Sequence, residues 1–227
     1  MEELKHIGII VDGNGRWANN KGKIRSEGHL EGSKTLEKLI LHISNTKLKY
    51  LSLYVFSNEN FKRDEKEVSY LMKLFVTMFK RVSKIYKEYN IKIVFSGRKT
   101  NLPDEVLKQM DKLIEVTKNN TGLVVNFCLN YSSHLEIIDA IKKINQDKID
   151  INKLDEQLFN KYLYQDLPPI DLLIRTSGEQ RLSNFMLWQL SYSELFFTKT
   201  YFPDFTTQEY DKIIEEFYKR NRRFGGN

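Results

Sequence analysis

Short apolar runs alternate with long amphipathic stretches along the chain, and this alternation predicts its secondary structure. The apolar runs are bounded by glycine or polar turns and are rich in β-branched and aromatic residues, which favours buried strands. The predicted strands span residues 8–11, 50–57, 91–97, 123–130 and 171–175. The stretches between them repeat apolar residues at helical spacing. The predicted helices span residues 29–44, 65–89, 104–118, 134–144, 155–164 and 206–223.

Strands that alternate with helices predict an α/β fold with a central, mostly parallel sheet flanked by helices on both faces. The carboxyl ends of parallel strands meet at one edge, where open α/β sheets bind their ligands. We therefore expect one edge to gather Asp12, Ser57 to Asn60, Asn130 and Arg175 to Gly178. The length of 227 residues, without a repeat or linker, predicts a single domain over residues 1–227.

Composition narrows the possible partners. With 36 basic and 30 acidic residues the formal charge is +6, which suits anionic ligands, an anionic membrane surface or nucleic acid. No run of Lys and Arg and no nucleic-acid motif supports the last of these. No apolar run is long enough to span a membrane, and the first residues lack the apolar core of a signal peptide. Cys128 lies in an apolar run, which predicts a buried, inert thiol and fits a reducing cytoplasm.

The first strand runs directly into Asp12-Gly13-Asn14-Gly15-Arg16, the first candidate site. The two glycines permit a tight turn and a close approach of backbone N–H groups to a ligand. A carboxylate and a forked guanidinium beside that turn suggest a magnesium-diphosphate site. A surface turn is the simpler interpretation of this motif alone, because Asp, Asn and Gly are ordinary turn residues.

A second candidate anion pocket follows the strand at 171–175. Arg175, Arg181 and Ser183 lie in a loop rich in Ser and Gly, where phosphate binding and structural ion pairing are about equally favoured. Glu194 stands among aromatic residues, where a carboxylate needs an ion pair or a metal. These two roles carry equal weight. His29 would either donate to a phosphate or serve the structure alone.

Several segments together resemble the signature of the cis-prenyltransferases. They are residues 12–17, 56–60, 175–185, 188–190 with Glu194, and 222–226, which occur in the family order from near the start of the chain to its end. The pattern is most similar to the bacterial members that make undecaprenyl diphosphate. The resemblance implies a homodimeric, magnesium-dependent, metal-binding transferase of EC class 2.5.1 with a hydrophobic tunnel.

By the same resemblance, the reaction belongs to isoprenoid biosynthesis. The enzyme would condense isopentenyl diphosphate onto an allylic diphosphate, with farnesyl diphosphate the expected primer. The product would be a long-chain Z-polyprenyl diphosphate, expected to be undecaprenyl diphosphate, the carrier-lipid precursor of cell-wall biogenesis. The family is cytoplasmic, and releasing such a lipid implies peripheral contact with a membrane. Product length and preferred primer do not follow from the sequence.

Roles carry over to matching positions. Asp12 would bind Mg²⁺ and assist departure of diphosphate, Glu194 would be a second Mg²⁺ ligand, and Asn60 would orient or relay a proton. The allylic diphosphate would be held by Gly13, Asn14, Gly15, Arg16, Arg25 and His29, with Trp17 lining the site. Isopentenyl diphosphate would be held by Arg63, Arg175, Arg181 and Ser183. Ser57 would lie near the condensing carbon, and Asn58, Glu59, Phe61 and Leu182 complete the expected substrate-binding set.

Two positions depart from the family pattern. Phe61 replaces a common Trp, and Ser132-Ser133-His134 replaces a common Gly-Gly-Arg. The tail 222–227 is expected to reach across the dimer and close the isopentenyl diphosphate site of the partner. A non-catalytic partner subunit, which the family also contains, is the competing hypothesis. Such a subunit would be expected to lack the Asp and Arg set that is present here.

Overall fold

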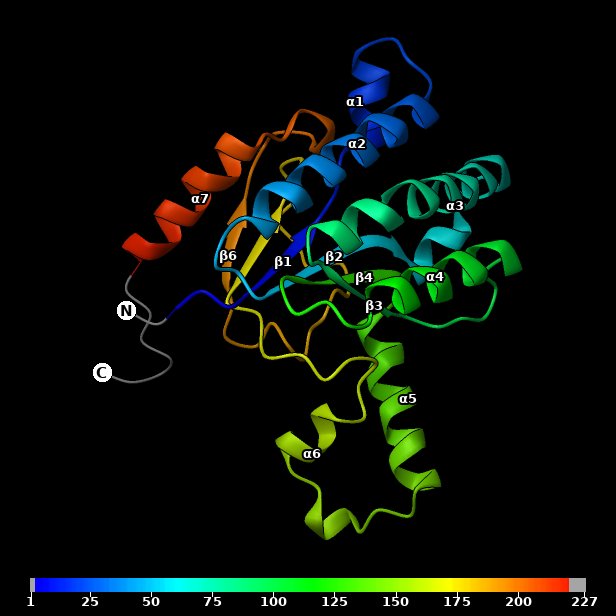
Figure 1. Cartoon of the computed structure of the whole chain (residues 1–227), viewed down its shortest axis with the longest axis vertical. Coiled ribbons are helices and arrows are strands. Elements are labelled where there is room, and N and C mark those ends of the chain that lie inside the picture. Colours follow the sequence, from blue (N-terminus) through cyan, green and yellow to red (C-terminus); the bar gives the residue numbers. More distant parts are fainter. Residues whose placement is uncertain (1–2, 221–227) are drawn as a thin grey trace.

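The computed structural model describes residues 3–220, and its centre is a sheet of six parallel strands in the order β3-β4-β2-β1-β5-β6 (Figure 1). The strands are β1 (His6–Ile10), β2 (Tyr50–Ser57), β3 (Lys92–Ser96), β4 (Val124–Tyr131), β5 (Leu172–Arg175) and β6 (Glu194–Phe197). Every neighbouring pair is parallel, so the predicted fold class, a parallel sheet flanked by helices, is confirmed.

The helices lie close to their predicted positions. They are α1 (Asn14–Asn20), α2 (Arg25–Ser44), α3 (Glu65–Glu88), α4 (Asp104–Thr117), α5 (Ser133–Gln146), α6 (Glu156–Asn160) and α7 (Thr207–Lys219). Short 3₁₀ turns are η1 (Asn58–Lys62), η2 (Ile151–Lys153) and η3 (Phe202–Asp204). Within the described range, none of these helices combines the length and hydrophobicity needed to cross a membrane. The tail 222–227 lies outside the described residues.

Three elements differ from the prediction. Helix α1 occupies the segment predicted to be a turn, and α2 begins at Arg25 rather than near residue 29. The α1 segment is rich in Gly and Asn and the α2 segment carries Gly28 near its start, which weakens the helical signal, and packing of α1 on α2 outweighs that weak propensity. Strand β6 was not predicted, because four residues of an edge strand give too short a pattern to recognise.

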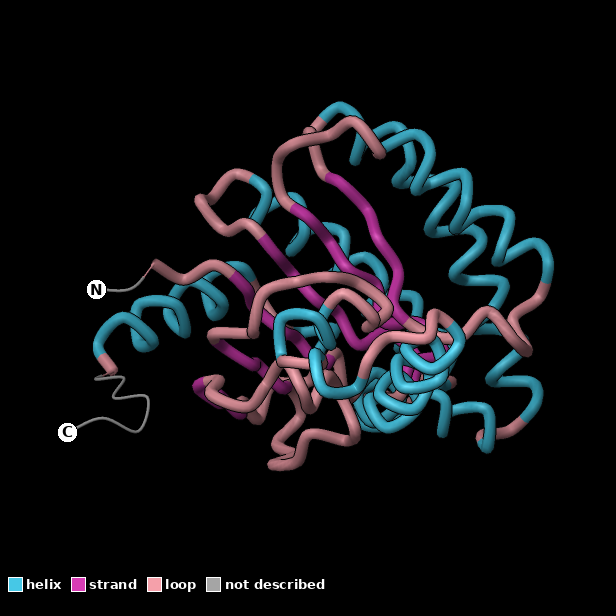
Figure 2. The backbone as a smooth tube through the Cα atoms, turned by 90° about the horizontal axis from the view of Figure 1, so that it is seen from below, coloured by secondary structure: helices cyan, strands magenta, loops and turns pink. Residues whose placement is uncertain are grey.

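The sheet is buried on both faces, which explains the continuous apolar runs in its strands (Figure 2). In β1, Ile7 and Ile9 belong to the large core beneath α2, α3, α4 and α7. Ile10 faces the opposite side, and a side chain at Gly8 would point the same way, within 3.3 Å of Phe185. That second face is covered chiefly by apolar side chains of the irregular segment 164–190. Cys128 is fully buried there, and burial raises its pKa, as expected of an inert thiol.

Close packing of α1 against α2 depends on Gly28. A Cβ atom at this position would lie 2.0 Å from the carbonyl oxygen of Asn14, a separation at which the backbone of one helix must move. The turn at Gly13, with φ of +103°, starts α1 at this place. The position of the whole 12–16 segment is therefore tied to a glycine on a different helix.

We predict that Gly28→Ala destabilises the protein by about 1–3 kcal/mol, because the methyl group overpacks the contact between α1 and α2. The free energy of unfolding from urea titration measures this effect. Lys38→Ala on the exposed side of the same helix is the control and should unfold at nearly the wild-type midpoint. Equal midpoints for the two variants would contradict the packing argument.

Candidate active site

A cavity of about 350 Å³ opens at the carboxyl edge of the sheet, where we expected a ligand site. Its wall contains thirteen predicted residues: Asp12, Gly13, Asn14, Gly15, Arg16, Arg25, His29, Ser57, Asn60, Arg63, Arg175, Arg181 and Ser183. The parallel strands bring these distant segments together, as expected. The wall also includes residues that were not predicted: Ile10, Val11, Tyr54, Val55, Phe56 and Leu71.

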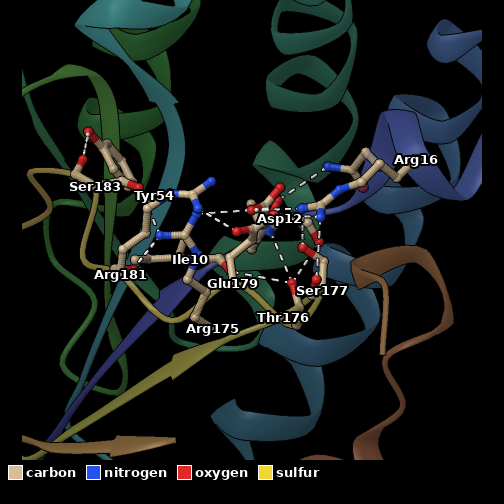
Figure 3. Close-up of polar contacts among 12 residues, drawn as sticks. Ile10, Asp12, Arg16, Tyr54, Arg175, Thr176, Ser177, Glu179, Arg181 and Ser183 are labelled. Carbon is tan, nitrogen blue, oxygen red and sulfur yellow. Dashed lines mark hydrogen bonds and ion pairs between the residues drawn. The ribbon is translucent and has the colours of Figure 1, made fainter. Parts of the chain in front are cut away.

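An ion pair between Asp12 and Arg175 forms the centre of the cavity (Figure 3). Arg175 Nη2 lies 3.0 Å from Asp12 Oδ2, and Ile10 pairs with Arg175 in the sheet, so the two charges end neighbouring strands. The Arg175 side chain is only 4 % exposed, and its Nε has no partner among the described residues. Burial raises the pKa of Asp12, but the hydrogen bond from Arg175 and the charge of Arg16 outweigh it and lower the pKa. The carboxyl is therefore ionised at neutral pH.

Arg16 extends this charged centre. Its guanidinium lies 3.2 Å from Asp12 and 2.7 Å from Glu179, and it donates to the hydroxyl of Ser177. Glu179 also pairs with Arg181. Hydrogen bonding from Arg181 is the largest cause of the lowered pKa of Glu179. The two arginines predicted to hold different diphosphates are thus linked by one carboxylate that the sequence did not single out as a site residue.

A second basic group surrounds Glu67 on the opposite wall. Arg25 makes two hydrogen bonds to its carboxylate at 2.9 and 3.1 Å, and both His29 and Arg63 lie 3.1 Å from it. Burial opposes ionisation of Glu67, but the bonds from Arg25 and His29 prevail and lower its pKa to about 2. The pKa of His29 is lowered because burial outweighs the attraction of Glu67. Glu67 was not predicted as a site residue, because its partners lie on α2 and in the turn before α3, where the spacing of charges within one helix gives no signal.

Ser57 and Asn60 line the same cavity as the two basic groups. The side-chain oxygen of Asn60 accepts a hydrogen bond from the backbone N–H of Ser57 at 3.1 Å, which fixes the amide at the start of η1. An amide oxygen held in this way can orient a donor but is a poor base at neutral pH. Tyr54, an unpredicted residue, donates to the carbonyl of Ser183 at 3.2 Å, so β2 also contacts the loop that follows β5.

Other predicted substrate-binding residues lie beside the cavity rather than in its wall. Trp17 donates from its indole to Asp204 at 2.7 Å. Phe61 packs edge-on against Phe56, with ring centroids 4.9 Å apart. Leu182 packs against the core on the second face of the sheet.

Two polar members of that set also support the wall from outside. Asn58 donates to the side chain of Asn130 at 3.0 Å. Glu59 accepts a hydrogen bond from Asn184 at 3.2 Å. Both residues join η1 to neighbouring elements, so their contacts in this structure are with protein groups.

Glu194, the predicted second metal ligand, lies at the other end of the strands. It begins β6 and is level with Leu172, whereas Asp12 follows the carboxyl end of β1. With a rise of about 3.3 Å per residue, Glu194 and Asp12 are separated by roughly 15 Å along the strand direction. Glu194 instead forms an ion pair with Arg220 at 2.9 Å, the alternative role considered for it. One chain therefore does not bring the two carboxylates to a common metal.

The donor set at Asp12 suits a cation that arrives with a diphosphate. Among residues 3–220 no group of three His, Cys, Asp or Glu side chains is arranged to hold a metal alone. Mg²⁺ is commonly bound by one or two carboxylates together with substrate phosphates and water. A single ionised carboxylate beside several arginines fits that mode, with the remaining oxygens coming from the ligand.

An apolar cavity of about 50 Å³ continues from the charged one. The two share Val11, Asn14, His29, Val55 and Leu71, and the apolar part runs between α2 and α3. Leu36 lines it from α2, and Leu74, Phe75 and Met78 line it from α3. Leu74 lay outside the predicted apolar stripe of that helix, and here it faces this second cavity.

Comparison of the sequence with known proteins is consistent with this site. Residues 10–225 match the prenyltransferase family described as "Putative undecaprenyl diphosphate synthase". An isoprenyl transferase of Fusobacterium nucleatum is 49% identical, with 98% of this chain and 96% of that protein aligned. A farnesyl-diphosphate-specific ditrans,polycis-undecaprenyl-diphosphate synthase of Buchnera aphidicola is 45% identical, with 99% and 92% aligned.

Solved structures show the same likeness. The lavandulyl diphosphate synthase of Lavandula x intermedia, in complex with dimethylallyl diphosphate, has a TM-score of 0.93 and 30% identity, covering 97% of this chain and 98% of that one. A probable undecaprenyl diphosphate synthase of Campylobacter jejuni has a TM-score of 0.84 and 32% identity, covering 99% and 100%. The chain is a transferase and belongs to the undecaprenyl diphosphate synthase family of prenyltransferases.

Proposed function

We propose that the chain condenses isopentenyl diphosphate onto farnesyl diphosphate and repeats the step to make undecaprenyl diphosphate. The observation that carries this proposal is one cavity that is lined by two basic groups and by Asn60 and that continues into an apolar cavity. Two diphosphates and a growing hydrocarbon chain need that combination. Family membership supports the reaction class.

The residues suit ionisation of an allylic diphosphate. Negative charge develops on the departing diphosphate, and fixed cationic donors stabilise that charge more in the transition state than in the ground state. Arg25, His29 and Arg63 gather around Glu67. Arg16, Arg175 and Arg181 gather around Asp12 and Glu179, and all six side chains line one cavity. Bound through Asp12 and the diphosphate, Mg²⁺ would neutralise part of the developing charge.

A substrate must displace the carboxylates that pair with these basic side chains in the structure. Glu67 and Glu179 occupy the donors that we assign to diphosphates, so binding exchanges a carboxylate for a phosphate of higher charge. The buried Nε of Arg175 offers a further donor without such competition from the described residues. The proton lost from isopentenyl diphosphate passes to diphosphate, with Asn60 orienting it.

We predict that Asp12→Asn and Asp12→Ala lower turnover by about a thousandfold, because each removes a contact to the metal and leaving group. Incorporation of radiolabelled isopentenyl diphosphate with farnesyl diphosphate and Mg²⁺ measures this. The Asn variant matters because its amide oxygen can still accept the hydrogen bond from Arg175, whereas Ala leaves the buried guanidinium without that acceptor. The control is Asp111→Ala, which breaks an exposed pair with Lys99. A folded Asp12→Asn variant with near-normal turnover would refute the assignment.

We also propose that the apolar cavity between α2 and α3 is the beginning of the product tunnel. It starts beside the predicted allylic site and leads away from the charges. A hydrocarbon chain that grows by repeated addition needs a dry path whose length limits the product. Lengthening would displace side chains of α2 and α3 along this path.

Met78→Trp should therefore shorten the polyprenyl product while leaving the first condensation intact, because Met78 lines the apolar cavity. Chromatography of the dephosphorylated products measures chain length. Thr77→Trp is the matched control, since the neighbouring Thr77 is exposed and should leave the product unchanged. Identical product lengths for both variants, with both folded, would place the tunnel elsewhere.

A homodimer is a further part of the proposal, supported by an apolar edge. Strand β6 ends the sheet and exposes Leu195 by 38%, and the segment before it exposes Trp188 by 37% and Tyr192 by 67%. Aromatic residues on an open strand edge are typical of protein interfaces. We expect the enzyme to be cytoplasmic and to contact the membrane only peripherally, where its lipid product is released.

Leu195→Arg should shift the protein from dimer toward monomer, because it buries a charge in the proposed interface. Light scattering coupled to size-exclusion chromatography gives the mass. Ile114→Arg on α4 is the control, since Ile114 is similarly exposed on another element. A Leu195→Arg protein with the same mass as the control variant would exclude this edge as the interface.

A further inference from the structure

The loop that carries Ser183 has a backbone that needs external support. Ser183, Asn184 and Met186 have φ angles of +50°, +61° and +39°, in the left-handed region that residues other than Gly rarely adopt. Three such residues within four positions persist only where surrounding contacts hold them. The loop follows the Arg175 strand directly, so its conformation bears on the charged cavity.

Asn184 makes the contacts that supply this support. Its amide nitrogen donates to the hydroxyl of Ser132 at 2.7 Å and to the carboxylate of Glu59 at 3.2 Å. Its side-chain oxygen accepts from the backbone N–H of His134 at 3.1 Å. One side chain therefore bridges the start of α5 and the η1 turn.

Ser133 strengthens the same junction. Its backbone N–H donates to the carbonyl of Asn184 at 2.9 Å, and its hydroxyl accepts from the backbone N–H of Leu187 at 3.0 Å. These hydroxyls belong to the Ser132-Ser133-His134 segment that departs from the family pattern. In this chain the departure supplies side-chain hydrogen bonds that two glycines at the same positions would lack.

The held loop in turn orients the cavity. Ser183 Oγ accepts from Arg175 Nη1 at 2.8 Å, and the same nitrogen donates to the carbonyl of Arg181. Tyr54 donates to the carbonyl of Ser183 (Figure 3). With Nη1 fixed by the loop, Nη2 of Arg175 faces Asp12. A shift of the loop would change the direction in which Arg175 and Ser183 present their donors.

We propose that Asn184, anchored by Ser132 and Ser133, is a positioning residue for the isopentenyl diphosphate subsite. It also couples that subsite to η1, which carries Asn60. The assignment rests on the proposed function, because it takes isopentenyl diphosphate as the ligand of Arg175, Arg181 and Ser183. Asn184 does not line the cavity, so it acts through the loop and not on the substrate.

Asn184→Gly removes the side chain without straining the backbone, because Gly adopts a φ of +61° without strain. We expect its KM for isopentenyl diphosphate to rise about tenfold, since small misplacements of binding groups are costly. The KM for farnesyl diphosphate should stay within about twofold, because Arg25 and His29 are held separately by Glu67. Initial rates with each substrate varied in turn, together with the thermal midpoint, give these values.

Variants of Ser132 provide an independent test if the Gly variant fails to fold. Ser132→Ala removes the acceptor for Asn184 and should raise the same KM, whereas Ser132→Thr keeps the hydroxyl and should restore it. Lys142→Ala, on the exposed side of α5, is the matched control.

The outcomes separate this inference from the proposed function. A wild-type chain that does not incorporate isopentenyl diphosphate overturns the proposed function. An active wild type whose Asn184→Gly and Ser132→Ala variants match Lys142→Ala overturns the positioning role alone. Equal rises of both KM values would also overturn it, since that result indicates general loosening of the fold.

Discussion

The ion pair between Asp12 and Arg175 is the interaction on which the site depends. Arg175 ends β5 in register with Ile10, the last residue of β1, and Asp12 follows Ile10 by two residues, so the sheet brings the two charges together. Burying a guanidinium as deeply as that of Arg175 is costly without a counter-ion, and Asp12 supplies it. The same carboxylate stays ionised because of this partner, as its lowered pKa indicates. The pairing of two strands therefore creates the contact that keeps Asp12 ionised and Arg175 paired.

The remaining cations of the cavity are also held by carboxylates. Glu67 gathers Arg25, His29 and Arg63, and Glu179 joins Arg16 to Arg181. In this arrangement the positive groups are fixed in advance, which reduces the reorganisation needed when charge develops on a ligand. Because a carboxylate already holds these positive groups, an anion that binds them must replace that carboxylate. Ligands with more negative charge than one carboxylate are favoured by such an exchange, and diphosphates meet this requirement.

The supports of the cavity come from far along the chain. Gly28 sets the approach of α1, which begins one residue after Gly13, and Asn184 connects the loop after β5 to both α5 and η1. Neither residue lines the cavity wall. Long separation in sequence is expected here, because a parallel sheet joins neighbouring strands through crossovers of many residues. Changes in the site can therefore arise from substitutions on elements that do not touch it.

Much of this arrangement followed from the sequence. Apolar runs and helical stripes predicted the order of elements, and the rule for parallel sheets predicted that Asp12, Ser57 and Arg175 would meet at one edge. Resemblance supplied the roles, and thirteen assigned residues do line the cavity. Local patterns suffice for these features because the residues that face the core recur at a fixed spacing along a strand or helix.

Tertiary structure alone decided the rest. Helix α1 forms despite its Gly and Asn content because α2 covers it, and β6 exists because β5 offers an open edge. Glu67 became visible as a site residue only when Arg25 and His29 from α2, and Arg63 from the turn before α3, converged on it. Glu194 lies away from Asp12 because it begins β6, a strand too short to predict, at the end of the sheet opposite to the cavity. These outcomes depend on pairings between distant segments, and no local pattern specifies which charges will be neighbours once the sheet has formed.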